Sequence, residues 1–319
     1  MNICIVIPAY NEEKAVGETV REYRDAFPEA RIVVIDNNSN DGTAEEARAM
    51  LNPQRDLLLT EKRQGKGFAV KSGLSRLEAD IYVMIDGDAT YPTDDARRLV
   101  DEMLDTRVDM VVGDRISGGT YTAQNTRPGH GWGNSMLTYI ISNLAGRHFN
   151  DVLSGMRIMS RPFVTAFDVR SSGFQLETEM NVIAAYLRAD VREIPISYRA
   201  RPDGSDSKLS TIRDGLRIFH FALANWITFA PMQPFLILAS VMSVISGVLG
   251  YRVIAGFLET GWPYTTTAIA AGASGLVAIL AFFFGLSLKI ISRNDRRREI
   301  THLLEAKRQW NTRLDAKNL

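Results

Sequence analysis

The strongest constraint on this chain is a pair of long apolar runs near its carboxyl end. Residues 234–257 contain one charged side chain, Arg252, and residues 265–291 contain only Lys289, close to the end of the run. A helix of roughly 20 apolar residues is long enough to cross the hydrocarbon core of a bilayer. The sequence therefore predicts a membrane segment over residues 233–292, with transmembrane helices at about 234–257 and 265–291.

The orientation of these two helices follows from the charges that flank them. The connector, residues 258–264, has no Lys or Arg but contains Trp262 and Tyr264, which suit a membrane interface. Basic residues follow the second run directly: Arg293, Arg296, Arg297 and Arg298. We expect the connector outside and both soluble ends in the cytoplasm, at the cytoplasmic (inner) membrane. The chain also opens on a strand pattern rather than on a signal peptide, which favours a cytoplasmic amino-terminal part.

The segments on either side of the membrane runs are amphipathic or charged. From Ile212 to Trp226, apolar side chains recur at helical spacing and basic side chains share the other side. Residues 211–232 are therefore predicted to form an amphipathic helix in the bilayer interface. Residues 293–319 are predicted to form a cytoplasmic, charged helical tail that lies on anionic lipid or contacts another subunit.

The first 210 residues alternate short apolar runs with amphipathic segments. Strands are expected at 3–7, 31–35, 56–60, 81–85 and 110–113, and helices at 13–26, 43–51, 68–77 and 93–105. This alternation predicts an α/β domain over residues 1–210, with a mostly parallel sheet and helices on both faces. Ligands of such sheets bind at the carboxyl ends of the strands.

The composition excludes several classes of protein. Lys+Arg and Asp+Glu both number 37, which argues against a nucleic-acid-binding protein. The one cysteine, Cys4, lies in the first predicted strand, so an intramolecular disulfide and a thiolate metal site are both excluded. The loop after that strand lacks the Gly-x-Gly-x-x-Gly of dinucleotide-binding enzymes, and no loop ending in Gly-Lys-Ser/Thr is present.

Polar side chains follow four of the predicted strands, where each strand ends. Asp86 and Asp88 follow the fourth strand, and their hard oxygen ligands suit a divalent cation. An isolated Asp-x-Asp is more often only an acidic turn. Glu12, Asp36 and Lys66, however, follow other strands of the same sheet. Because the carboxyl ends of parallel strands share one edge, we expect these side chains to converge on one crevice.

These polar segments carry a family resemblance, in unbroken order over residues 3–215. Residues 7–13 (IPAYNEE), 34–43 (VIDNNSNDGT), 65–67 (GKG) and 86–92 (DGDATYP) resemble family 2 glycosyltransferases, which have the Rossmann-like GT-A fold. Residues 153–157 (LSGMR), 174–179 (FQLETE), 194–196 (IPI) and 207–210 (SKLS) are similar to the dolichol-phosphate mannose synthase branch and its bacterial polyprenyl-phosphate relatives.

The resemblance implies a membrane-anchored, metal-dependent, inverting glycosyltransferase. Such an enzyme moves one sugar from a nucleotide-diphosphate donor to a polyprenyl phosphate and gives a lipid-linked monosaccharide. GDP-mannose, UDP-glucose and UDP-N-acetylhexosamine all remain possible donors. The implied partners are therefore the nucleotide sugar, the polyprenyl phosphate and the lipid bilayer. Related membrane-anchored members form homo-oligomers, which favours an oligomer such as a tetramer here.

The resemblance also assigns the donor side of the site. It implies that Asp86 and Asp88 hold Mg²⁺ or Mn²⁺ against the diphosphate and that Lys66 lies near the nucleotide. The base and ribose pocket would be lined by Pro8, Tyr10, Glu12 and Asp36. The chain departs from the common pattern at Asn37 and Asn38, where an Asp-Gly pair is more usual.

The acceptor side needs positive charge, because a lipid monophosphate must approach an anionic donor. Arg115 matches the arginine that faces the acceptor phosphate in this branch, and Arg201 and Lys208 fall in a later basic segment with the same implied task. Arg157 and Arg199 are further candidates on charge alone. Glu177 and Glu179 are two residues apart, so one of them is expected to face the crevice; Glu179 is the candidate for positioning or proton handling, with a structural ion pair as the alternative.

Two other functions are compatible with these patterns. A processive polysaccharide synthase shares the catalytic fold but carries Gln-x-x-Arg-Trp near its acceptor site, whereas the Gln-Trp pair here, Gln309-Trp310, lies in the tail. A catalytically silent membrane scaffold would bind nucleotide sugar or lipid phosphate without transfer. The intact Asp86/Asp88 pair, with Arg115 and Lys208, favours an enzyme over a scaffold.

Overall fold

The computed structural model describes residues 1–119, 138–139, 141–142, 146–167, 169–173, 175–201, 232–262 and 264–318. The chain divides into two compact units, Met1–Phe221 with Glu299–Leu319, and Ala222–Arg298. The predicted amphipathic helix at 211–232 falls almost entirely outside the described residues, as do Lys208 and the SKLS motif.

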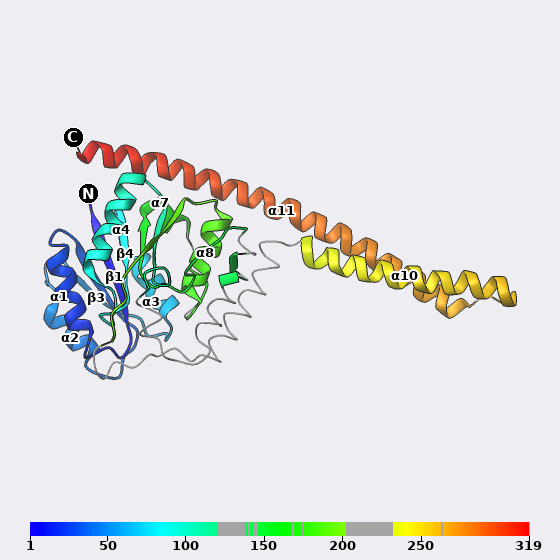
Figure 1. Cartoon of the computed structure of the whole chain (residues 1–319), viewed down its shortest axis with the longest axis horizontal. Coiled ribbons are helices and arrows are strands. Elements are labelled where there is room, and N and C mark those ends of the chain that lie inside the picture. The colour runs from blue at the N-terminus through cyan, green and yellow to red at the C-terminus, as the bar shows by residue number, and fades with distance from the viewer. Residues whose placement is uncertain are drawn as a thin grey trace. The chain divides into compact units, whose positions relative to one another are not determined.

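The first unit is built on a seven-stranded sheet (Figure 1). Its strands are β1 Ile3–Ala9, β2 Arg31–Asp36, β3 Leu57–Thr60, β4 Ile81–Met84, β5 Met110–Asp114, β6 Arg157–Ser160 and β7 Val191–Pro195, in the order β3-β2-β1-β4-β6-β5-β7. Every neighbouring pair is parallel except those of β6, which runs antiparallel between β4 and β5. The predicted mostly parallel α/β sheet is confirmed.

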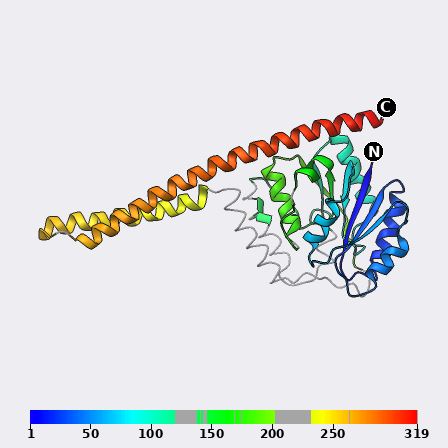
Figure 2. The same cartoon turned by 180° about the vertical axis from the view of Figure 1, so that it is seen from behind.

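Helices cover both faces of this sheet (Figures 1 and 2). They are α1 Val16–Ala26, α2 Thr43–Met50, α3 Lys66–Leu74, α4 Thr93–Thr106, α7 Arg161–Ala166 and α8 Leu176–Tyr186. Because successive strand residues point to opposite faces, Ile5 and Ile7 join a buried cluster with α1, α2 and α4, whereas Val6 joins a second cluster with α3, α7 and α8. Both faces of the sheet are therefore apolar and covered.

The strand order places a switch point at the centre of the sheet. The chain steps from β1 to β2 and β3 on one side, and then crosses to β4 on the other side of β1. The loops after β1 and β4 therefore leave the same edge in diverging directions, and the crevice between such loops is where open α/β sheets bind ligands. Glu12 lies in the first of these loops, and Asp86 and Asp88 lie in the second.

The second unit contains α10, Met232–Thr260, and the first part of α11, Thr265–Asn318. Both helices are long and apolar enough to cross a membrane, as the sequence predicted. The two helices contact each other through Phe235 and Phe284, whose rings meet edge to face at 5.0 Å, and through Ser246 Oγ, which donates to Ala271 O at 2.8 Å.

Helix α11 does not end with its apolar run, and its last turns belong to the first unit. Trp310 is 3% exposed and its Nε1 donates to Asp80 O at 2.9 Å. Lys307 Nζ contacts Asp109 Oδ2 at 3.0 Å and Asp190 Oδ2 at 2.7 Å. Asp80, Asp109 and Asp190 each directly precede a strand. The tail, expected to meet lipid or another subunit, thus packs against the amino edge of its own sheet, opposite the Asp86 loop.

Candidate active site

The loop after β4 holds two carboxylates at the switch point of the sheet. Asp88 is 2% exposed and accepts hydrogen bonds from Thr90 Oγ1 at 2.6 Å and Thr90 N at 3.3 Å. Asp86 lies against Gly155, where an added Cβ would come within 2.4 Å of Asp86 Oδ2. The LSGMR motif therefore contributes a glycine that leaves room for the Asp86 carboxylate.

Each of these carboxylates contacts a cation that also contacts a second carboxylate. Lys66 Nζ donates to Asp86 Oδ1 and to Glu177 Oε1, the latter at 2.5 Å. Arg201 Nη2 lies 2.6 Å from Asp88 Oδ2, and Arg201 Nη1 lies 3.6 Å from Glu12 Oε1. Of the four loops expected to converge, three meet here: Glu12, Lys66 and the Asp86/Asp88 pair take part in one network of ion pairs, whereas the Asp36 carboxylate forms its hydrogen bond elsewhere.

Burial and neighbouring charges shift the pKa values of Asp88 and Lys66. Burial raises the pKa of Asp88, and the nearby charge of Asp86 raises it further. Burial opposes ionisation of Lys66, but the attraction of Asp86 and Glu177 outweighs it and raises the pKa of the ammonium above its ordinary value. The edge of the sheet thus holds a carboxylate that is costly to ionise without additional positive charge nearby.

The donor set fits a divalent cation that also binds substrate. Within the described residues, no group of three or more His, Cys, Asp or Glu side chains gathers as a metal site. Asp86 and Asp88 would supply two hard oxygen atoms, and the remaining ligands would come from diphosphate and water, as is usual for Mg²⁺. Lys66 and Arg201 contact the same two carboxylates, so a bound cation would compete with them.

At the end of β2, Asn37 connects this strand to the loop that precedes Lys66. Its Nδ2 donates to Arg63 O at 2.7 Å and to Glu61 O at 3.2 Å, and its Oδ1 accepts from Gly65 N at 2.7 Å. Asn38 has a φ of 60°, a left-handed conformation that asparagine tolerates better than most residues. The departure from the usual Asp-Gly pair therefore preserves the turn and adds two donors.

The other predicted nucleotide residues lie around the same edge. Asp36 is buried and its Oδ1 accepts from Ser39 N at 3.2 Å. Pro8 lies in β1, and Tyr10, which is partly exposed, follows that strand. These residues lie at the carboxyl ends of β1 and β2, where the sequence placed them; their role in binding a nucleotide stays a prediction.

Replacing Asn37 with Asp is expected to lower the free energy of unfolding by about 1–3 kcal/mol, because a carboxylate would face two carbonyl oxygens without a donor. The matched control is Asn38→Asp, the same change at the adjacent exposed position, where no loss of that size is expected. Thermal unfolding of the two variants measures the difference. Equal losses would show that the Asn37 hydrogen bonds do not hold the loop.

Among the residues predicted for the acceptor side, Arg115 is held by a buried carboxylate. Its Nε donates to Asp151 Oδ2 at 2.8 Å, and its Nη2 donates to Asp151 Oδ1 at 3.0 Å. Burial raises the pKa of Asp151, but the charge and hydrogen bonds of Arg115 outweigh burial and lower it. Asp151 was not among the predicted site residues, and its position just before the LSGMR motif was the available signal. Arg199, a further candidate, pairs with Glu22 at 3.0 Å on the surface.

The structure argues against the prediction that Arg157 binds the acceptor phosphate. Its side chain is fully buried in β6, and its guanidinium donates to Asn181 Oδ1 at 2.7 Å, Ser154 O at 3.1 Å and Val152 O at 3.3 Å. Burying a guanidinium is tolerated when hydrogen bonds satisfy it, and here they connect β6 to α8 and to the loop before β6. Arg157 is a structural residue.

The choice between the two glutamates of α8 also changes. Glu179 accepts hydrogen bonds from Arg170 N and Ser171 N, each at 2.9 Å, and from Ser171 Oγ at 2.7 Å, so it anchors a loop. Glu177 is the member of the pair that faces Lys66 and the Asp86 network. The spacing argument was right that the two diverge, but the geometry favours Glu177.

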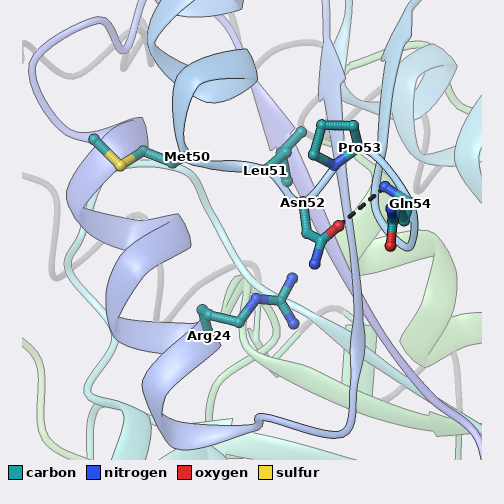
Figure 3. A pocket seen from close by; sticks show the side chains of 6 residues that line it. All are labelled: Arg24, Met50, Leu51, Asn52, Pro53 and Gln54. Atoms are coloured by element: carbon teal, nitrogen blue, oxygen red, sulfur yellow. Dashed lines mark hydrogen bonds between the residues drawn. The ribbon is translucent and has the colours of Figure 1, made fainter.

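A shallow pocket elsewhere in the first unit offers none of this chemistry (Figure 3). It is lined by Arg24, Met50, Leu51, Asn52, Pro53 and Gln54, and Gln54 N donates to Asn52 Oδ1 at 2.9 Å. These residues lie at the carboxyl ends of α1 and α2 and in the loop before β3, at the edge of the sheet away from Asp86. The carboxylate network is therefore the candidate active site.

Comparison with known proteins decides the family. Residues 4–166 match the model of Glycosyl transferase family 2. Glycosyltransferase AglJ of Haloferax volcanii is 35% identical over 225 residues, which cover 68% of this chain and 69% of that protein. The chain belongs to glycosyl transferase family 2. The resemblance read from the ordered motifs is confirmed, and family membership makes the protein a glycosyltransferase.

Two further known proteins are similar to this chain over about the same share of its length. Undecaprenyl-phosphate mannosyltransferase of Micrococcus luteus is 29% identical over 220 residues, covering 66% of this chain and 88% of that protein. Glucosyl-3-phosphoglycerate synthase of Mycobacterium tuberculosis, solved with Mn²⁺, UDP and glucosyl-3-phosphoglycerate, superposes with a TM-score of 0.57 at 20% identity and covers 70% of this chain and 79% of that one. The GT-A fold is confirmed.

Proposed function

We propose that this protein is a membrane-anchored, metal-dependent, inverting glycosyltransferase that moves one sugar from a nucleotide diphosphate to a polyprenyl phosphate. The observation that carries the proposal is the Asp86/Asp88 pair at the switch point of a family 2 fold, with Lys66 and Arg201 beside it. Relatives named for undecaprenyl-phosphate, dolichyl-phosphate and polyprenol monophosphomannose transfer support the acceptor class. Two apolar helices support the anchor.

The donor half of the reaction needs positive charge at the leaving group. As the bond from the sugar to the diphosphate breaks, negative charge develops on the departing phosphate. A divalent cation bound by Asp86 and Asp88, Mg²⁺ or Mn²⁺, would stabilise that charge. Solved relatives that hold Mn²⁺ with UDP support this assignment. Pro8, Tyr10, Glu12, Asp36 and Lys66 stay the proposed nucleotide side.

The acceptor half needs positioning rather than a strong base. The second pKa of a phosphate monoester is about 6, so the lipid phosphate is largely dianionic at neutral pH. One of its oxygens attacks the anomeric carbon opposite the leaving diphosphate, and the configuration inverts. The engagement of Glu177 and Glu179 in other contacts agrees with this. Arg115, Arg201 and Lys208 are the proposed cations for the acceptor, and Arg157 is no longer among them.

The proposed arrangement at the membrane is two spans with the catalytic unit and carboxyl end in the cytoplasm, as a homo-oligomer. The arginines after the second span and the aromatic residues in the connector support this orientation.

The function is tested by supplying full-length protein with undecaprenyl phosphate, Mn²⁺ and, in turn, labelled GDP-mannose, UDP-glucose and UDP-N-acetylglucosamine. We expect one of these donors to give a lipid-linked monosaccharide. Undecaprenol, which lacks the phosphate, is the control acceptor and should give no product. Thin-layer chromatography of the lipid extract measures the product. A long polymer would instead indicate a processive synthase, and absence of product with every donor would indicate a binding scaffold.

A further inference from the structure

The ammonium of Lys66 is shared between two acidic side chains from different parts of the fold. Its Nζ donates both to Asp86 Oδ1 and to Glu177 Oε1. The Lys66 and Glu177 side chains are 11% and 4% exposed, whereas Asp86 is 29% exposed. Of the two carboxylates, Asp86 is therefore the more open to a ligand, and Glu177 is the enclosed one.

The local structure explains why these groups meet. Lys66 begins α3, where the helix dipole disfavours a cation, so its position needs another source of stabilisation. Glu177 lies in the first turn of α8, where the dipole favours an acid. The two helix starts can lie close together because Gly65 and Gly67 have no side chain. A Cβ on Gly65 would lie 1.9 Å from Ser172 O, and a Cβ on Gly67 would lie 2.0 Å from Ser171 O, both in the backbone just before α8.

A divalent cation bound to Asp86 would compete with Lys66 for the same carboxylate, and Glu177 provides Lys66 with a second carboxylate. The cation would contact the carboxylate that now neutralises Lys66, and it would repel the ammonium. A buried ammonium without a carboxylate partner is costly. Because Glu177 already contacts Nζ, Lys66 can lose Asp86 and keep a carboxylate partner without leaving the site.

We propose that Glu177 is a positioning residue that retains Lys66 beside the donor when a divalent cation takes Asp86. The proposal rests on the metal site of the proposed function. Before the cation binds, Lys66 contacts both Asp86 and Glu177. After it binds, Lys66 would contact Glu177 alone. The retained ammonium then lies next to the bound cation, where it can contact the donor diphosphate.

The test is the affinity of the full chain for Mn²⁺ in the presence of UDP, measured by isothermal titration calorimetry. Glu177→Gln keeps the size of the side chain but removes the charge that retains Lys66, so Mn²⁺ affinity is expected to fall about tenfold. The matched control is Glu179→Gln, on the same helix and equally buried, but bonded to the 170–171 loop. It is expected to lower the thermal unfolding midpoint while leaving Mn²⁺ affinity within about twofold.

A double-mutant cycle with Lys66→Met separates retention of Lys66 from a direct effect of the Glu177 charge. If Glu177 acts through Lys66, the Glu177→Gln loss shrinks in the Lys66→Met background. An equal loss in both backgrounds would overturn the proposal, as would equal affinities of Glu177→Gln and the wild type. Absence of Mn²⁺ binding by the wild type would instead overturn the metal site itself.

Discussion

Replacing Asp88 with Asn is expected to lower the rate of sugar transfer by about a thousandfold, because it removes one of two anionic ligands from the proposed metal site. The fold should survive the change. Burial and the charge of Asp86 already disfavour the ionised form of Asp88 and raise its pKa, so a neutral amide relieves repulsion even as it loses the contact with Arg201. The unfolding midpoint should therefore change by only a few degrees.

The measurement is the initial rate of lipid-linked sugar formation with the preferred donor. Asp101→Asn is the control, since it makes the same change on the exposed face of α4 and should retain the wild-type rate. Chelation with EDTA should stop the wild-type enzyme, and added Mn²⁺ should restore it. A folded Asp88→Asn variant that works within tenfold of the wild-type rate would remove the metal assignment.

The sheet was predictable where the apolar pattern is local. Five of the seven strands were expected within a few residues of their observed bounds, because each is a short apolar run followed by turn residues. Strand β6 was not, since its first residue is Arg157 and its neighbours β4 and β5 both precede it by more than 40 residues in the chain. Such pairing depends on tertiary structure rather than on periodicity.

The location of the candidate site could be predicted from the sequence, but the contacts between its side chains could not. The rule that ligands bind at carboxyl ends of strands brought Glu12, Lys66 and Asp86 together correctly. It could not distinguish a buried arginine, Arg157, from one beside a carboxylate, Arg201, because both occur in polar motifs. Nor could it choose between glutamates two residues apart, which point about 200° apart around a helix.

The carboxyl-terminal tail shows a pattern that its charges obscured. Leu303, Trp310 and Leu314 are spaced by seven and four residues, which places them on one face of a helix. All three are buried against the first unit, Leu303 in the cluster with α3 and α8, and the other two in the cluster with α1 and α4. The abundance of Arg, Lys and Glu favoured a helix that faces lipid or another subunit, and the three apolar side chains show that one face of this helix packs on its own unit.

Replacing Trp310 with Ala is expected to lower the free energy of unfolding of the first unit by about 3–5 kcal/mol, the usual loss for a buried aromatic residue. For a unit of this size that corresponds to roughly 10 °C or more in the apparent unfolding midpoint. Trp310→Phe keeps most of the apolar area but loses the hydrogen bond to Asp80 O, so its loss should be about 1 kcal/mol. Differential scanning fluorimetry of the full chain in detergent measures both.

The neighbouring leucines provide a control within one turn of the same helix. Leu303 is 2% exposed and Leu304 is 51% exposed, so Leu303→Ala should cost about 2–5 kcal/mol and Leu304→Ala much less. If Trp310→Ala and Leu303→Ala were no more harmful than Leu304→Ala, the tail would not be held on the sheet. If both variants are more harmful than Leu304→Ala, the helix that contains the second apolar run also stabilises the first unit. Truncation after Arg298 should then destabilise that unit even though it leaves the residues around Asp86 unchanged.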